Sequence, residues 1–265
     1  MRVLVAAMLT TTLAIGGLLG CVKVDLDAIE ELSLEEKDLL GRKVFELAQD
    51  ELGLVESGPV ASGLRSLGQE LSRELDVPVR FHLLDHELDQ ATSFPSGDVV
   101  VTKRWLRRAE SSDELLGVLL EQVAHVGSRD VTRTIVASYQ PEVLRSALAG
   151  GQGGLLEAVA ANLTYQGSFG RHSDATKARS DLQVVLWLRQ LGADASAWPD
   201  FLGRYLSVRR KKDYHARSHP IDDKRVERCR GDLAQVDLVR ALDGKAIGAS
   251  VDELFAELDR SRKSG

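Results

Sequence analysis

Most of the chain carries apolar residues at intervals of three and four, which predicts amphipathic helices. Two such segments, 33–54 and 60–75, begin the patterned part of the chain. From residue 111 onward the helical spacing dominates, and it predicts helices over 114–130, 155–163, 174–191, 198–208, 222–236 and 251–262.

Two short segments have the alternation of a β-strand instead. In 77–84, Val79, Phe81 and Leu83 alternate with polar neighbours, and 98–102 is a second apolar run. The segment 89–97 between them contains Pro95 and a Ser-Gly pair, so it is interpreted as a loop. The pattern predicts an α+β fold, mostly helical, with one small sheet.

The N-terminus has a different character. Residues 1–20 contain one charge, Arg2, within an apolar run that ends before Cys21, which is typical of a secretion signal. The sequence Leu-Leu-Gly-Cys at 18–21 resembles the lipobox of bacterial lipoproteins, so we expect a lipid on Cys21. An uncleaved membrane anchor and a plain signal peptide are the alternatives. Residues 21–32 then form an acidic tether, and 33–265 form one domain with C-terminal accessory helices.

The net charge and the cysteine content limit which partners and which disulfides we expect. The net charge of −6 argues against a nucleic-acid or anionic-membrane surface, so membrane attachment is expected through the lipid alone. With Cys21 acylated, Cys229 is the only remaining thiol and no intrachain disulfide is expected.

The segment 114–130 is apolar on nearly every side but contains Glu121, Gln122 and His125. Residues four apart share one face of a helix, so Glu121 and His125 project side by side. This is the layout of a His-Glu-x-x-His zinc-peptidase helix with two residues changed. Taken alone, the spacing is explained equally well by chance.

The flanking motifs add specificity, because they follow one another over about two hundred residues. They are Leu40-Gly41-Arg42, the run from Gln90 to Gly97, the strand Val99 to Thr102, Glu114-Leu115, Ser180-Asp181, Gly192, Ser218-His219-Pro220 and Arg225. In this order they resemble the zinc metallopeptidase family of the CAAX prenyl endopeptidase and HtpX, especially its BepA-like and Oma-like bacterial branch. The resemblance implies a zincin-like metallopeptidase fold with a small sheet packed on the active-site helix.

The resemblance also assigns the positions that would carry the chemistry. Glu121 stands at the first ligand histidine, Gln122 at the general-base glutamate, His125 at the second ligand and Lys177 at the third. A neutral amide cannot take a proton from water near neutral pH, and an ammonium repels a dication. The degenerate motif Glu121, Gln122 and His125 is therefore expected to be catalytically inactive.

No metal or other cofactor is expected, with zinc held by His125, Glu121 and Asp174 as the alternative. In place of zinc, we expect an ion pair between Lys177 and Glu121 that makes the former active site a structural strut.

These inferences predict a lipid-anchored envelope protein, on the periplasmic face of the outer membrane, that resembles a zinc metalloendopeptidase but does not cleave. It would bind unfolded envelope proteins or an envelope complex in quality control, with the 98–102 strand as the sheet edge that takes an extended peptide. An active metalloendopeptidase with non-standard zinc ligands and a purely structural lipoprotein are the alternatives. The expected cleft residues are Val99, Val100, Val101, Thr102, Pro95, Gly97 and His219, although a helix start before Asp222 also explains His219.

Overall fold

The computed structural model describes residues 32–263 except for 152, 167–171, 209–218 and 237–244. The expected signal segment, Cys21 and the tether up to residue 31 lie outside the described residues. Among the helices that are described, none combines the length and apolar character needed to cross a membrane.

Helices make up most of the described chain, as the pattern predicts. In chain order the elements are α1 (Leu34–Leu52), β1 (Leu54–Val55), α2 (Pro59–Leu75), β2 (Arg80–Leu84), β3 (Ala91–Ser93), β4 (Asp98–Thr102), α3 (Lys103–Leu106), α4 (Ser112–Gly127), α5 (Asp130–Tyr139), α6 (Pro141–Leu148), α7 (Leu155–Gln166), α8 (Asp174–Gln190), α9 (Ala197–Val208), α11 (Asp223–Val236) and α12 (Lys245–Lys263). The predicted α+β class, mostly helical with one small sheet, is confirmed.

The sheet has four strands in the order β1-β2-β4-β3. β2 and β4 are parallel and both outer pairs are antiparallel. The expectation that the 98–102 strand lies at an edge is therefore wrong, because β4 has a partner on each side. The outer strand beside it is β3, in a segment interpreted as a loop. Its sequence, Ala-Thr-Ser, has no apolar alternation, so the pattern gave no sign of a strand.

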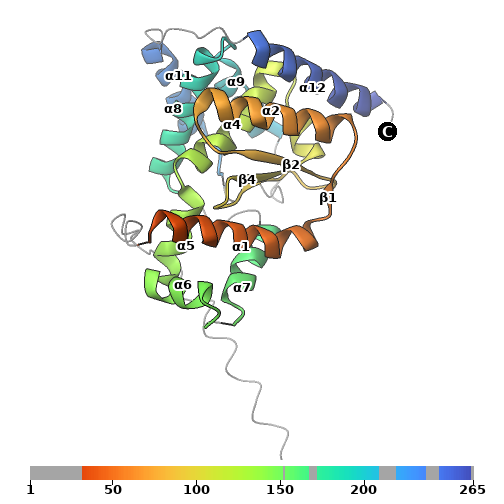
Figure 1. The fold of residues 1–265 in the computed structure, drawn as a ribbon. Helices are drawn as coiled ribbons and strands as arrows, with labels where there is room; N and C mark the ends of the chain where they lie inside the picture. The colour runs from red at the N-terminus through yellow and green to blue at the C-terminus, as the bar shows by residue number, and fades with distance from the viewer. Residues whose placement is uncertain (1–31, 152, 167–171, 209–218, 237–244, 264–265) are drawn as a thin grey trace, which may run out of the picture.

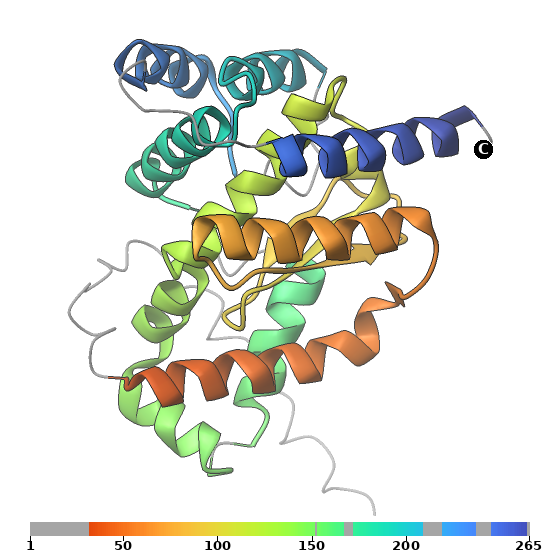
Figure 2. The ribbon, with the colours of Figure 1, turned by 45° about the horizontal axis from the view of Figure 1, so that its top comes forward.

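Alternation along β4 divides the core into two layers. Val99 and Val101 pack in a cluster with α2, α4, α8, α9, α11 and α12, whereas Val100 packs in a second cluster with α1, α5, α6 and α7. Figures 1 and 2 show α2 on one face of the sheet and α1 on the other. Because both faces are covered, all five side chains of β4 are buried.

Helix α4 runs through the first layer and carries the degenerate motif. Its N-cap is Ser111, whose hydroxyl accepts a hydrogen bond from the Glu114 amide at 3.1 Å. In a capping box the Glu114 carboxylate would accept from the amide of Ser111. Here it accepts from the Glu110 amide at 2.6 Å instead. The helix contacts β3, α5, α8, α9 and α12, so its polar side chains are enclosed by other elements.

Candidate functional site

The three polar residues of α4 are all buried. Glu121, Gln122 and His125 are 0%, 1% and 1% exposed. Buried polar groups need partners, and removing a carboxylate from water is expensive without a compensating charge. The partners of these side chains therefore show what the site can do.

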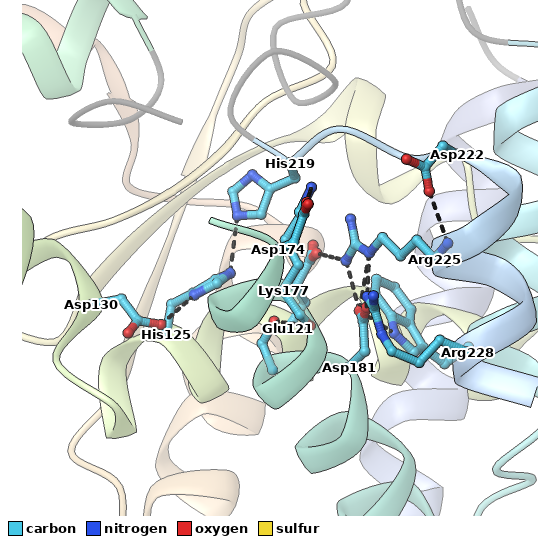
Figure 3. Close-up of polar contacts among 12 residues, drawn as sticks. Glu121, His125, Asp130, Asp174, Lys177, Asp181, His219, Asp222, Arg225 and Arg228 are labelled. Carbon is cyan, nitrogen blue, oxygen red and sulfur yellow. Dashed lines mark hydrogen bonds and ion pairs between the residues drawn. The ribbon is translucent and has the colours of Figure 1, made fainter. Parts of the chain in front are cut away.

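Glu121 is paired with an arginine from α11. Arg225 Nη2 lies 2.6 Å from Glu121 Oε1 and 2.7 Å from Asp181 Oδ1, and Arg225 Nε lies 2.9 Å from Asp181 Oδ2 (Figure 3). Burial alone would lower the pKa of Arg225, but the two carboxylates outweigh it and raise that pKa well above its ordinary value. Arg225 is therefore the buried counter-charge of both Glu121 and Asp181.

Asp181 has further partners that hold it in place. The Trp198 indole donates to Asp181 Oδ1 at 3.1 Å, and Arg228 Nη2 lies 3.2 Å from Asp181 Oδ2. The Arg225 guanidinium also lies 5.9 Å from the centre of the Trp198 ring. Asp181 matches the aspartate that follows the third ligand in the family motif, so this position serves the ion-pair network here.

Lys177 does not make the predicted pair with Glu121. Its ammonium lies 2.7 Å from Asp174 Oδ1, one turn earlier in α8. The Lys177 side chain is 5% exposed whereas that of Asp174 is 91% exposed, so the pair reaches toward the surface. The predicted replacement of zinc by a positive charge was therefore assigned to the wrong residue, and Arg225 is the cation at Glu121.

His125 belongs to a separate group of histidines. Its Nδ1 lies 2.8 Å from Asp130 Oδ2, and its Nε2 lies 3.0 Å from Nε2 of His219. The ring of His172 stacks on that of His125 with centroids 4.2 Å apart and planes 8° apart. His219 thus comes to α4, as the family motif implies, and His172 is the third member of this group.

Burial and neighbouring charges together shift the pKa values of Asp130 and His172. Burial alone would raise the pKa of Asp130, but the hydrogen bond from His125 and the nearby charges of His125 and Arg179 lower it. Burial is the main cause that lowers the pKa of His172 to about 3, and the charge of His125 acts in the same direction. His172 is therefore neutral, with a lone pair available on the ring.

Gln122 lies beside the histidine group. Within the described chain, neither its amide nitrogen nor its amide oxygen has a hydrogen-bond partner. It lines a cavity of about 10 Å³ together with β3, Val131, His172 and His219. That volume is close to the minimum for one water molecule.

The other expected cleft residues lie elsewhere. Val99, Val100 and Val101 are 0–1% exposed in the interior of the sheet, with Thr102 at the end of the same strand. Pro95 and Gly97 lie in the tight turn between β3 and β4, where Gly97 has φ +83° and its amide donates to the Phe94 carbonyl at 3.0 Å. Of the expected cleft residues, only His219 lines the cavity beside Gln122.

The residues at the family's zinc-ligand positions do not fit a zinc ion. Glu121 accepts from Arg225, the third position holds an ammonium, and no carboxylate stands at position 122. The alternative set of His125, Glu121 and Asp174 is not brought together as a ligand group in the described residues. The group that is brought together is His125, His172 and His219.

Two known proteins have distant sequence similarity to this chain, in agreement with the resemblance described above. The chain is 24% identical over 259 residues to the beta-barrel assembly-enhancing protease of Yersinia pestis, covering 86% of this chain and 49% of that protein. It is 23% identical over 214 residues to a protein of Vibrio cholerae that carries the same name provisionally, covering 74% of this chain and 43% of that protein. No protein-family model matches. The chain thus spans about half the length of these curated relatives and is similar to proteins named as beta-barrel assembly-enhancing proteases.

Proposed function

We propose that this chain is a cell-envelope protein that binds polypeptide in a metallopeptidase-like fold without cleaving it, in envelope quality control. The similarity to beta-barrel assembly-enhancing proteases supports the fold and the setting. The observation that carries the loss of cleavage is the pairing of Glu121 with Arg225 at 2.6 Å, at the position of the first zinc ligand.

The general base is also missing. A positioned base contributes on the order of 10² to 10⁴ in rate, and the amide of Gln122 supplies none of it. Asp130, the next carboxylate along the chain, is paired with His125 and Arg179. Two separate replacements therefore act against hydrolysis.

Polypeptide would bind along β3 in this proposal. An extended peptide adds to the outer strand of a sheet through backbone hydrogen bonds. Within the described sheet β3 is the terminal strand on the side of α4, and it borders the cavity beside Gln122. The peptide would lie where a substrate of the family meets the active-site helix. Peptide binding would therefore be retained although cleavage is lost.

The sequence of residues 1–21 supports the attachment and location that we propose. Lipid on Cys21 would hold the protein on the periplasmic face of the outer membrane, with unfolded envelope proteins or an envelope complex as partners. An active metalloendopeptidase with non-standard ligands is the competing function, and the protease names of the relatives favour it.

Hydrogen exchange tests the binding site. With reduced, carboxymethylated α-lactalbumin as the unfolded probe, the amides of Ala91–Ser93 should exchange more slowly. The opposite sheet edge, β1 (Leu54–Val55), is the internal control and should not change. Protection at β1 alone, or at neither edge, contradicts binding along β3.

A cleavage assay separates the two functions. The same unfolded probe is incubated with the protein in zinc, with a chelator, and with neither. We expect intact probe in all three. Cleavage that the chelator abolishes would establish the active metalloendopeptidase instead.

A further inference from the structure

A cavity of about 300 Å³ lies where the parallel strands β2 and β4 end. Residues 85–87, directly after β2, form one of its walls, and residues from 103–108, directly after β4, form the other. The crevice outside the carboxyl ends of parallel strands is a common place for ligands in open sheets. None of these residues lines the cavity beside Gln122, so the two cavities are separate candidate sites.

The wall after β4 is strongly basic. Its sequence is Lys-Arg-Trp-Leu-Arg-Arg, which covers α3 and the two residues that follow. The side chains that line the cavity from this wall are all cationic and partly buried: Lys103, Arg104, Arg107 and Arg108. Trp105 and Leu106, both 0% exposed, anchor the same segment in the core. A chain with a net charge of −6 therefore holds four positive charges against one cavity.

One buried carboxylate orients two of these cations. The side chain of Asp89 is 0% exposed, and its oxygens lie 3.0 Å from Arg104 Nε and 2.5 Å from Arg108 Nη2. A guanidinium that is held along one edge keeps a defined plane, and its fork of donors matches the oxygens of a phosphate group. Asp89 thus makes this part of the cavity wall rigid.

The other two cations have no carboxylate partner within the described residues. Arg107 Nη2 donates to the carbonyl and the hydroxyl of Ser261 in α12, at 2.5 and 3.0 Å, and both are neutral acceptors. The ammonium of Lys103 makes no hydrogen bond or ion pair with any described residue. A concave wall concentrates the field of such charges and attracts anions.

The acidic residues of the opposite wall do not neutralise these two cations. Asp85 and Glu87 are exposed, and the side chain of Glu87 is 95% exposed. Glu87 lies 3.6 Å from Arg104 Nη1, in a pair that solvent screens. These carboxylates oppose an anion in the cavity, so removal of one should strengthen anion binding.

We propose that this cavity binds a phosphate monoester, with Lys103 and Arg107 as its main contacts. A phosphate monoester carries about two negative charges near neutral pH, which matches the two cations that lack a carboxylate. Arg104 and Arg108 supply oriented donors beside them. A volume of about 300 Å³ also leaves room for the alcohol part of the ester, either a small soluble molecule or a lipid headgroup.

Titration calorimetry of the full chain in an uncharged detergent tests the site. The three probes are inorganic phosphate, glycerol phosphate and dihexanoyl phosphatidic acid, each also titrated into detergent alone. We expect saturable binding of one probe per chain, weakened by added salt. Lys103→Met should lower the affinity about 10- to 100-fold, because a charge-assisted hydrogen bond is lost. Glu87→Gln should raise it.

The probes also distinguish the source of the phosphate. Affinity for dihexanoyl phosphatidic acid at least about 10-fold above that for glycerol phosphate would identify a lipid headgroup, because the acyl chains add apolar contacts. A smaller difference would identify a soluble ester. Either result supports the phosphate site itself.

Arg73→Met is the matched control, since it removes one positive charge at a side chain of α2 that is 68% exposed and does not line the cavity. It should leave the affinity unchanged, and circular dichroism shows whether each variant folds. Absence of saturable binding for all three probes, or unchanged affinity in a folded Lys103→Met variant, would overturn the proposal. Peptide binding is measured separately, by exchange at Ala91–Ser93, so failure of one proposal leaves the other standing.

Discussion

Arg225 Nη2 lies 2.6 Å from Glu121 Oε1, and the same guanidinium holds Asp181 (Figure 3). One cation therefore compensates two carboxylates that are each 0% exposed. Buried ion pairs contribute little net stability as a unit, but removing one member leaves the other charges uncompensated.

Arg225→Met should lower the free energy of unfolding by about 3–5 kcal/mol, because the carboxylates of Glu121 and Asp181 lose their main counter-charge. Urea denaturation followed by circular dichroism measures it. Arg230→Met is the matched control, since Arg230 pairs with Asp200 at 3.4 Å where both side chains are more than half exposed. That change should cost less than about 1 kcal/mol. Equal effects of the two variants would argue against the network.

Replacing Gln122 by leucine should stabilise the zinc-free protein by about 1 kcal/mol. Its two unpartnered amide atoms are costly to bury, and leucine fills a similar volume without polar atoms. Thermal denaturation in the presence of a chelator gives the comparison. Glu121→Leu, one position earlier, should have the opposite sign, because it removes one of the two carboxylates that compensate the buried charge of Arg225. A loss of stability in Gln122→Leu would show that the amide has a partner.

The carboxyl group of Asp98 should make the free energy of unfolding depend on pH. Burial alone would raise the pKa of Asp98, but hydrogen bonds from His82, Arg80 and Ser96 lower it to about 2 from 3.8. Because the folded-state pKa lies below the unfolded value, the stabilisation is complete above about pH 4 and is lost as the pH falls toward 2. It amounts to about 2 kcal/mol.

Unfolding of Asp98→Asn between pH 5 and 2 tests this point. Its free energy of unfolding should fall less steeply with acid than that of the parent protein. Ser96→Ala removes one donor, at 2.6 Å, and should move the acid-induced loss to higher pH. Parallel curves for Asp98→Asn and the parent would refute the assignment.

Gly41→Ala should destabilise the protein although alanine favours helices by about 1 kcal/mol. A Cβ at Gly41 would lie 2.5 Å from the Ser96 amide nitrogen and 2.7 Å from the Pro95 carbonyl carbon, both backbone atoms. Overpacking of this kind costs about 1–3 kcal/mol. Glu46→Ala, on the exposed side of the same helix, should stay within about 0.5 kcal/mol. A Gly41→Ala variant that is more stable than the parent would show that the backbone at Pro95 and Ser96 can move to accommodate the new Cβ.

The helices could be predicted from the sequence because helical periodicity is local. The segments 33–54 and 60–75 correspond to α1 and α2 within a few residues, and 174–191 corresponds to α8. The strand order could not be predicted, since it depends on contacts between segments. β3 has only three residues, and its pairing with β4 is specified by the turn at Phe94 and Gly97.

The site could be predicted in part. The buried motif of α4 and the nearness of His219 follow from spacing and resemblance. The cation at Glu121 was assigned to Lys177 because the family places a ligand there, whereas the side chain of Lys177 turns to Asp174. A signal for Arg225 was present, since it belongs to the family motif that follows Ser218-His219-Pro220, but its pairing with Glu121 depends on contacts between distant segments.

The order of the strands bears on how the chain folds as it is synthesised. β3 leaves the ribosome before β4, the strand it pairs with, and β2 waits for the same parallel partner. A nascent chain that stops at Gly97 has α1, α2 and β2 but lacks β4 and the helices α4 and α7 that complete the two core layers. Insertion of Asp98–Thr102 completes both pairings in one step, so chains arrested just before it should be the ones that proteases and chaperones capture.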